Sequence, residues 1–342
     1  MSAWEVMPLV GCVCSNGKPY RVSLKKGTVN KLLINFLGGG LSWNAETAAN
    51  PITIGAMLQK KDCYYIPHMP TAMFKMVHIG LLDPKDKRNP FHDWTILNIP
   101  YVSADFHLGD HDFVYQDKTL HHHGQKNVAA ALGVRKELFP HTPDVLMIMG
   151  QSAGGFGCLA YAPQIQALYP KAGKTIVYSE GSHLHTSLWP EIARDVWKVK
   201  PELLAYVKSD DLIVDLFCYA RDNMPASTQF LHSNTVWDKM LVEIMYKMNH
   251  GEKVANAAAL REFYDTLVHV TQRLKRELPH YSYYLTDYGK NPKDGTTAHI
   301  FAGAPKLLYN PLQDDMSMAD WICCGIEGEP VDIGAQFLEK GA

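Results

Sequence analysis

The sequence predicts an α/β protein with a mainly parallel central sheet and helices on both faces. Short apolar segments alternate along the chain with longer helical patterns, and no internal repeat or low-complexity tract interrupts this alternation. The apolar segments are rich in Ile, Val, Leu and Tyr, and most of them end in Gly, Asn or Ser, which is typical of strands. Strands that are separated by helices of this length are joined by right-handed crossovers, which place them parallel in one sheet.

The predicted elements follow one another in a regular order. The strands are expected at residues 31–36, 95–99, 145–149, 175–178, 228–232 and 281–286. The helices are expected at residues 125–138, 154–168, 190–207, 237–248 and 252–278. A chain of 342 residues with 46% hydrophobic residues can bury a large core, so we expect a single domain over residues 1–342. In such sheets, sites gather at the carboxyl ends of the strands.

Composition and charge exclude several classes of partner. The 33 basic and 35 acidic residues leave a formal net charge of -2, so we expect no nucleic acid partner. No stretch reaches the roughly 18 to 20 apolar residues of a membrane span, and the first residues lack the basic start and apolar run of a signal peptide. We therefore expect a soluble, cytoplasmic protein without a membrane partner, whose seven cysteines are free thiols.

The clearest chemical motif follows the third predicted strand. Residues 145–149 run straight into Gly150-Gln-Ser-Ala-Gly154, and a helical pattern comes next. This is the G-x-S-x-G pattern of a nucleophile elbow, in which a tight strand-to-helix turn holds a serine at its apex. The amino end of the following helix favours negative charge beside that serine. Ser152 is therefore the candidate nucleophile, and a structural Gly/Ser turn is the alternative.

A serine nucleophile needs a base to take its proton and an acid to orient that base, and both should lie downstream. His299 is the candidate base because it follows the last predicted strand and the polar loop 291–297. The other downstream histidines fall mostly inside predicted helices or strands, where a structural role is expected; they are His183, His185, His232, His250, His269 and His280.

Asp238 is the candidate acid. It follows the predicted strand 228–232 and its turn, at the entrance of the next helix. Asp287, which follows the strand before His299, is an alternative, and the further rivals Asp210, Asp211 and Asp215 fall in or near a helical pattern.

The oxyanion formed during acyl transfer needs backbone donors that already point at it. One is expected to be the amide of Ala153, directly after the nucleophile. The other is expected in Gly38-Gly-Gly-Leu41, where the first predicted strand ends and three glycines let the backbone turn its N–H groups inward without side chains in the way.

Taken together, these segments resemble the pectin acetylesterase and Notum carboxylesterase family of serine hydrolases. The similar segments are Leu37-Gly-Gly-Gly-Leu-Ser-Trp43, Asp105-Phe-His-Leu-Gly-Asp110, Gly150-Gln-Ser-Ala-Gly-Gly155, Phe230-Leu-His-Ser-Asn-Thr-Val-Trp-Asp238 and Thr297-Ala-His299. They occur in the family's order over most of the chain.

The resemblance implies an α/β-hydrolase-like catalytic domain with Ser152 as nucleophile, Asp238 as acid and His299 as base, and with Gly40, Leu41 and Ala153 as oxyanion donors. The expected activity is that of a serine esterase, which hydrolyses acyl esters through an acyl-serine intermediate. By resemblance the acyl group is of short-chain acetyl type, and a carbohydrate is a candidate for the alcohol. No cofactor is required. The alternatives are a serine peptidase or amidase on the same fold, and a non-catalytic ligand-binding member of the fold.

Other signals are given structural roles. The run 121–123 is three adjacent histidines, which cannot all face one ion, so it is expected to be a polar turn before a helix rather than a metal site. Asp105, His107, Asp110, His111 and Asp112 are expected to line the cleft or contact substrate rather than bind metal. The tryptophans near predicted strand ends, Trp43, Trp94, Trp189 and Trp237, could stack on a sugar, but filling the core is the commoner role.

Overall fold

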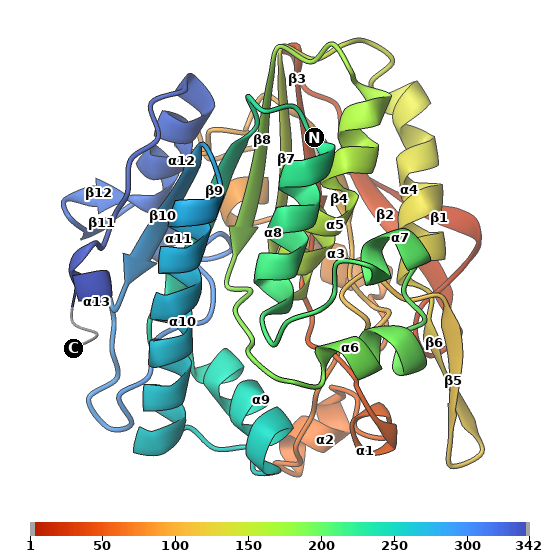
Figure 1. Ribbon diagram of the computed structural model, residues 1–342. Coiled ribbons are helices and arrows are strands. Elements are labelled where there is room, and N and C mark those ends of the chain that lie inside the picture. The colour runs from red at the N-terminus through yellow and green to blue at the C-terminus, as the bar shows by residue number, and fades with distance from the viewer. Residues whose placement is uncertain (1–3, 340–342) are drawn as a thin grey trace.

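An eight-stranded sheet in the order β1-β2-β4-β3-β7-β8-β9-β10 runs through the middle of the molecule (Figure 1). The computed structural model describes residues 4–339. The strands are β1 (Trp4–Val13), β2 (Pro19–Lys25), β3 (Lys31–Phe36), β4 (Thr95–Ile99), β5 (His111–Tyr115), β6 (Lys118–His122), β7 (Val145–Gln151), β8 (Lys174–Glu180), β9 (Gln229–Thr235), β10 (Tyr281–Thr286), β11 (Pro311–Gln313) and β12 (Met316–Ser317).

The helices vary widely in length. They are α1 (Ala45–Ala48), α2 (Ile54–Leu58), α3 (Phe74–Val77), α4 (Gly124–Leu138), α5 (Ala153–Leu168), α6 (Trp189–Glu191), α7 (Pro201–Leu204), α8 (Leu212–Asn223), α9 (Lys239–His250), α10 (Ala257–Glu277), α11 (Pro305–Leu308), α12 (Met318–Glu327) and α13 (Gln336–Glu339). Shorter 3₁₀ turns lie at Thr71–Met73 and Gly80–Leu82, and a π-helical turn lies at Ile192–Val196.

The sheet is mainly parallel, which confirms the predicted fold class. The six predicted strands are β3, β4, β7, β8, β9 and β10, and they pair in parallel with one another. The strands β1 and β2 were not predicted, and they add an antiparallel edge. Much of β1 is exposed or half-buried, and its register shifts between Pro8 and Val13, so it lacks the compact apolar pattern of the other strands.

Side chains alternate between two cores on the two faces of the sheet. In β7, Leu146 and Ile148 face the larger core, which is covered by α4, α5, α8 and α10, whereas Met147 and Met149 face the smaller core beneath α12. Because both faces of the sheet are buried here, the sequence of β7 is an unbroken apolar run over residues 145–149, which is typical of parallel strands.

The predicted helices are mostly confirmed, with one error. The patterns at 125–138, 154–168, 237–248 and 252–278 correspond to α4, α5, α9 and α10. The predicted helix at 190–207 is wrong, because the chain there forms α6, the π-helical turn and α7 as separate pieces. Lys198 adopts a φ of 55°, and Pro201 starts α7 with a ring that cannot continue a preceding helix. The helices α8 and α12 were not predicted.

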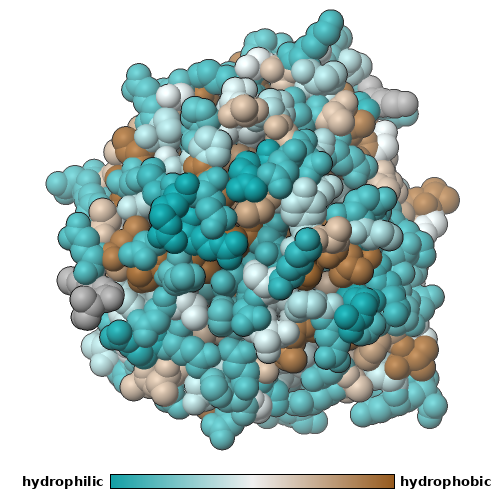
Figure 2. All heavy atoms as spheres, viewed as in Figure 1, coloured by the Kyte–Doolittle hydropathy of each residue, from teal (hydrophilic) through white to brown (hydrophobic). Residues whose placement is uncertain are grey.

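The prediction of a single domain over residues 1–342 stays a prediction, and its ends, 1–3 and 340–342, lie outside the described residues. On the face in Figure 2, hydrophilic residues predominate and hydrophobic ones form small separate patches. Within the described part of the chain, none of the helices combines the length and the apolar character that crossing a membrane requires.

Candidate active site

Ser152 lies at the tip of the tight turn between β7 and α5. Its backbone has φ 55° and ψ -127°, a combination that non-glycine residues rarely adopt. A β-carbon at Gly150 would overlap the carbonyl oxygen of Gly154, and one at Gly154 would overlap that of Phe36. The two glycines of the motif are therefore required by close backbone packing, and the turn has the geometry of a nucleophile elbow.

Two further contacts hold this turn in place. The backbone N–H of Ser152 donates to the carbonyl oxygen of Glu180 at the end of β8, at 2.7 Å. Gly38 packs against the turn so closely that a β-carbon there would lie 2.5 Å from the carbonyl oxygen of Gln151 and 2.6 Å from the β-carbon of Ser152. The serine is thus set between β8 and the glycine loop.

Asp238 and His299 form a buried pair. The Nδ1 of His299 donates to Oδ2 of Asp238 at 2.5 Å, and the side chains are 14% and 1% exposed respectively. The other oxygen of Asp238 caps α9 by accepting from the Leu241 amide at 3.0 Å. The loop that carries His299 is fastened beside Asp238, because the Thr297 amide donates to the Trp237 carbonyl at 2.8 Å. The carboxylate therefore fixes the imidazole's position and tautomer.

The second ring nitrogen of His299, Nε2, is not used in the contact with Asp238. Nε2 is buried and has no hydrogen-bond partner among the described residues. Burial alone would lower the pKa of His299, but the charge and hydrogen bond of Asp238, with the charge of Glu180, raise it above its ordinary 6.5. Burial raises the pKa of Asp238 in turn, against the opposing charge of His299. A histidine held in this way can accept a proton at Nε2 and is stabilised once it has done so.

Glu180 was not identified from the sequence. Its carboxylate is buried and accepts hydrogen bonds from the amides of Phe301 at 2.7 Å and Ala302 at 3.2 Å, just after His299. Burial raises the pKa of Glu180 to about 7, although those two amides oppose the shift. The signal that could have identified Glu180 is its place just after the predicted strand 175–178, because sites gather at the carboxyl ends of the strands.

The glycine loop presents free backbone donors. The amides of Gly39 and Gly40 have no partner among the described residues, and both glycines line the same cavity as Ser152. Ala153 is the first residue of α5, so its N–H has no acceptor within the helix. Leu41 differs, because its amide already donates to the carbonyl oxygen of Tyr64 at 2.9 Å. The structure therefore does not support Leu41 as an oxyanion donor.

Ser152 and His299 open into one large apolar cavity of about 820 Å³ at the carboxyl ends of the strands. Most of its lining is aliphatic or methionine side chains, including Ile52, Ile66, Met69, Met73, Met76, Val77, Ile79, Leu81, Leu82, Met240 and Ile244. Lys239, Glu243 and Lys253 add charge to the lining and are at least partly exposed. Cavities of this size hold drug-sized ligands.

The rival residues lie elsewhere. Asp287 and the other downstream histidines do not line this cavity. His185 has its own carboxylate, with Nδ1 at 2.7 Å from Asp211, but that pair is also outside the cavity. His183 and His232 are buried and hydrogen bonded to Thr266 and Tyr281, which fits the structural roles expected of them.

The residues predicted to line the cleft or contact substrate are not part of this cavity. Asp105 is buried away from the cavity and accepts from the amides of His107, Gly109 and Gly124. The residues His107, Asp110, His111 and Asp112 do not line the cavity either. The four tryptophans named above are also absent from its lining, and Trp43, Trp94 and Trp189 are buried in the core.

The fold is shared with a known structure. The Wnt deacylase Notum from Drosophila is similar with a TM-score of 0.63, over 97% of this chain and 95% of that chain, at 15% sequence identity. The comparison with curated proteins gave no match. The mainly parallel sheet with its helices is thus an α/β-hydrolase-like fold.

The sequence match defines the family. A model of the pectinacetylesterase family matches residues 7–186, which is more than half of the chain. The chain belongs to the pectinacetylesterase family and is, in general terms, a carboxylic ester hydrolase acting on acyl esters.

Proposed function

We propose that the protein hydrolyses acyl esters through a covalent acyl-Ser152 intermediate. The observation that carries this proposal is that Ser152, on its strained turn, and His299, oriented by Asp238 with Nε2 unpartnered, line the same cavity. The family supports ester hydrolysis in general, and the serine mechanism is our inference from these residues.

In the first half of the reaction, the Ser152 hydroxyl oxygen attacks the ester carbonyl carbon while Nε2 of His299 takes the hydroxyl proton. The imidazolium that results is stabilised by the carboxylate of Asp238. The tetrahedral intermediate then collapses, the carbon–oxygen bond to the alcohol breaks, and Nε2 returns the proton to the leaving alkoxide. In the second half, water attacks the carbonyl carbon of the acyl-Ser152 ester while Nε2 of His299 takes a proton from it. The bond between that carbon and the Ser152 oxygen then breaks, and Nε2 returns the proton to this oxygen. The carboxylic acid is released and Ser152 is restored.

The oxyanion is proposed to accept hydrogen bonds from the amides of Ala153, Gly39 and Gly40. The assignment rests on the unpartnered amides of the glycine loop and on the position of Ala153 at the first turn of α5. Such preorganised donors stabilise the charge that develops during acyl transfer, and each contributes roughly 3 to 4 kcal/mol to lowering the barrier.

We further propose that the cavity takes the acyl group and that the preferred acyl chain is longer than acetyl. A volume of about 820 Å³ with an aliphatic and methionine-rich lining far exceeds what an acetyl group fills. Each methylene moved from water into such a lining contributes about 0.8 kcal/mol, or roughly a fourfold gain in kcat/KM. The alcohol then lies toward Lys239, Glu243 and Lys253, where the lining is charged and suits a polar group such as a carbohydrate.

A series of p-nitrophenyl esters from acetate to palmitate tests the acyl assignment. We expect kcat/KM to rise about fourfold per methylene until the cavity is full. Replacing the half-buried Met73 of the lining (Met73→Trp) should reduce activity on long esters while leaving acetate almost unchanged. The matched control is Met57→Trp, because Met57 is an exposed methionine outside the lining.

The outcomes separate the possible activities. A flat or falling series with acetate as the best substrate would contradict the long-acyl assignment and favour an acetyl esterase. Matched anilides test the amidase alternative, and anilide rates equal to those of the esters would overturn the ester preference. If neither series is hydrolysed by the folded wild-type protein, the proposed catalysis itself is wrong.

A further inference from the structure

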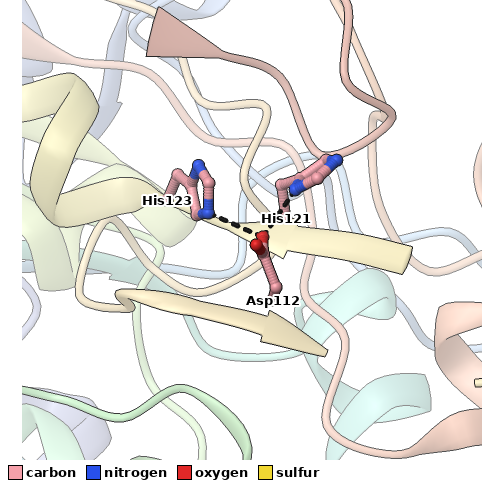
Figure 3. Close-up of side chains that lie close together, drawn as sticks. All are labelled: Asp112, His121 and His123. Atoms are coloured by element: carbon pink, nitrogen blue, oxygen red, sulfur yellow. Dashed lines mark hydrogen bonds and ion pairs between the residues drawn. The ribbon is translucent and has the colours of Figure 1, made fainter. Parts of the chain in front are cut away.

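A second group of chemically active side chains lies on the β5–β6 hairpin, away from the Ser152 cavity. Asp112, His121 and His123 place one ligand atom each within 4.8 Å of one another, and Figure 3 shows both imidazoles directed at the carboxylate. The same oxygen, Oδ1 of Asp112, lies 2.6 Å from Nδ1 of His121 and 2.8 Å from Nε2 of His123.

The hairpin register explains why these three meet. Asp112 on β5 lies directly opposite His121 on β6, so their side chains share one face. His123 follows at a spacing of two, which returns its side chain to that face, whereas His122 points to the other side and bonds the Ser103 carbonyl at 2.9 Å. The prediction of a polar turn at 121–123 is wrong, since β6 extends through His122.

The His123 ring shows that the cluster is incompletely satisfied as it stands. Its Nε2 is buried and lies 2.8 Å from Oδ1 of Asp112, but it makes no aligned hydrogen bond to any residue in the described part of the chain. The Asp112 oxygen is close to this nitrogen but is not aligned with it as a hydrogen bond requires. A buried ring nitrogen that lies beside a carboxylate without a well-aligned hydrogen bond is suited to ligation.

We propose that Asp112, His121 and His123 bind one divalent late first-row transition metal ion, with zinc as the best fit. Two imidazole nitrogens and a carboxylate oxygen are typical zinc ligands, at about 2.0 to 2.2 Å from the metal. A tetrahedral site with such bonds spaces its ligand atoms roughly 3.3 Å apart. Asp112 is 58% exposed at its side chain, so little packing opposes the rotation of that side chain that this spacing requires.

Lys126, which lies close enough to His123 to repel a cation there, has an acidic partner of its own. The Lys126 ammonium is itself paired with Asp110 at 2.8 Å, which offsets its repulsion of a cation.

The ion would tie together β5, β6 and the start of α4, because His123 is the residue before Gly124, the first of that helix. Three protein ligands leave a fourth position for water. The three residues take no part in the Ser152 cavity, so this inference is independent of the proposed esterase mechanism.

Zinc titration by isothermal calorimetry, on the full untagged chain, tests the proposal. We expect one zinc ion per chain in the wild type, and binding at least tenfold weaker in both Asp112→Asn and His121→Ala. The control is His141→Ala, which removes an exposed histidine outside the cluster and should bind as the wild type does. Two separate ligand variants are used so that misfolding of one, checked by circular dichroism, does not decide the result.

Cobalt substitution identifies the ligands independently. The seven cysteines are free thiols, and Cys323 and Cys324 are adjacent and half-buried, so they offer a competing site. We expect a visible Co²⁺ spectrum with nitrogen and oxygen ligands that disappears in Asp112→Asn. Thiolate-to-cobalt charge transfer, zinc affinity unchanged in both ligand variants, or no wild-type binding at micromolar zinc would each overturn the proposal.

Discussion

The carbonyl oxygen of Glu180 accepts the backbone N–H of Ser152 at 2.7 Å. The carboxylate of the same residue accepts the amides of Phe301 and Ala302, just beyond His299. Glu180 therefore joins the serine turn to the histidine loop through one buried residue. It is a positioning residue, because it supports both parts of the proposed site without lining the cavity itself.

Removing the Glu180 side chain should loosen the histidine loop. Glu180→Ala leaves two buried amides without an acceptor, so we expect a loss of about 1 to 3 kcal/mol in the free energy of unfolding and a fall in kcat. Glu180→Gln retains an acceptor oxygen and should be nearly as stable as the wild type. Denaturant unfolding and ester kinetics measure both, and equal stability of the Ala and Gln variants would contradict the role.

The pH profile of ester hydrolysis should report His299. Its ring must be neutral to take the Ser152 proton, and its pKa is raised above 6.5 by Asp238 and Glu180 against the effect of burial. Because this pKa is raised, the protonated and inactive form of His299 persists up to a higher pH. As the pH is lowered, kcat/KM should therefore fall with a midpoint above 6.5. Burial raises the pKa of Glu180 to about 7, so its carboxyl is partly ionised in this range. Glu180→Gln removes that charge and should move the midpoint downward. A wild-type midpoint below 6.5 would contradict the arrangement.

The backbone of Ser152 should store strain that glycine relieves. A non-glycine residue at φ 55° and ψ -127° costs roughly 1 to 3 kcal/mol, and part of the relief is offset by the greater chain entropy of unfolded glycine. We expect Ser152→Gly to be about 1 kcal/mol more stable than the wild type and Ser152→Ala to be nearly unchanged. Both should lose ester hydrolysis by about 10⁴-fold or more. A glycine variant less stable than the alanine variant would show that the turn is not strained.

The choice of acid can be tested with two matched substitutions. Asp238→Asn should lower kcat by roughly 10⁴-fold, because an amide cannot hold His299 in the tautomer that leaves Nε2 free. Asp287 lies outside the cavity, so Asp287→Asn should change kcat less than about twofold. Steady-state kinetics of both variants settle the assignment, and the opposite pattern would transfer the role to Asp287.

The sequence was a good guide to features that depend on local pattern. The strand of residues 145–149 and the following G-x-S-x-G motif predicted the turn at Ser152, because apolar runs and required glycines are visible in a short window. The half-exposed β1 was missed, since Pro8 and the register shift break its pattern. The broken segment at 190–207 was predicted as one helix because its apolar spacing is helical, although Lys198 interrupts the backbone.

Features that depend on contacts between distant segments were harder to predict from the sequence. The Leu41 amide is occupied by the Tyr64 carbonyl, which no local pattern around residue 41 could indicate. The pairing of Asp238 with His299 depends on how the loop at Thr297 docks on Trp237. Likewise, Asp112 meets His121 through the register of the hairpin, which the run of three adjacent histidines does not reveal by itself.

Labelling with a fluorophosphonate probe, followed by mass spectrometry of the labelled peptide, tests the central assignment most directly. We predict one adduct per chain, on Ser152, with labelling lost in Ser152→Ala and strongly slowed in Asp238→Asn. Folded wild-type protein that takes up no probe, or an adduct on another residue that persists in Ser152→Ala, would contradict the account.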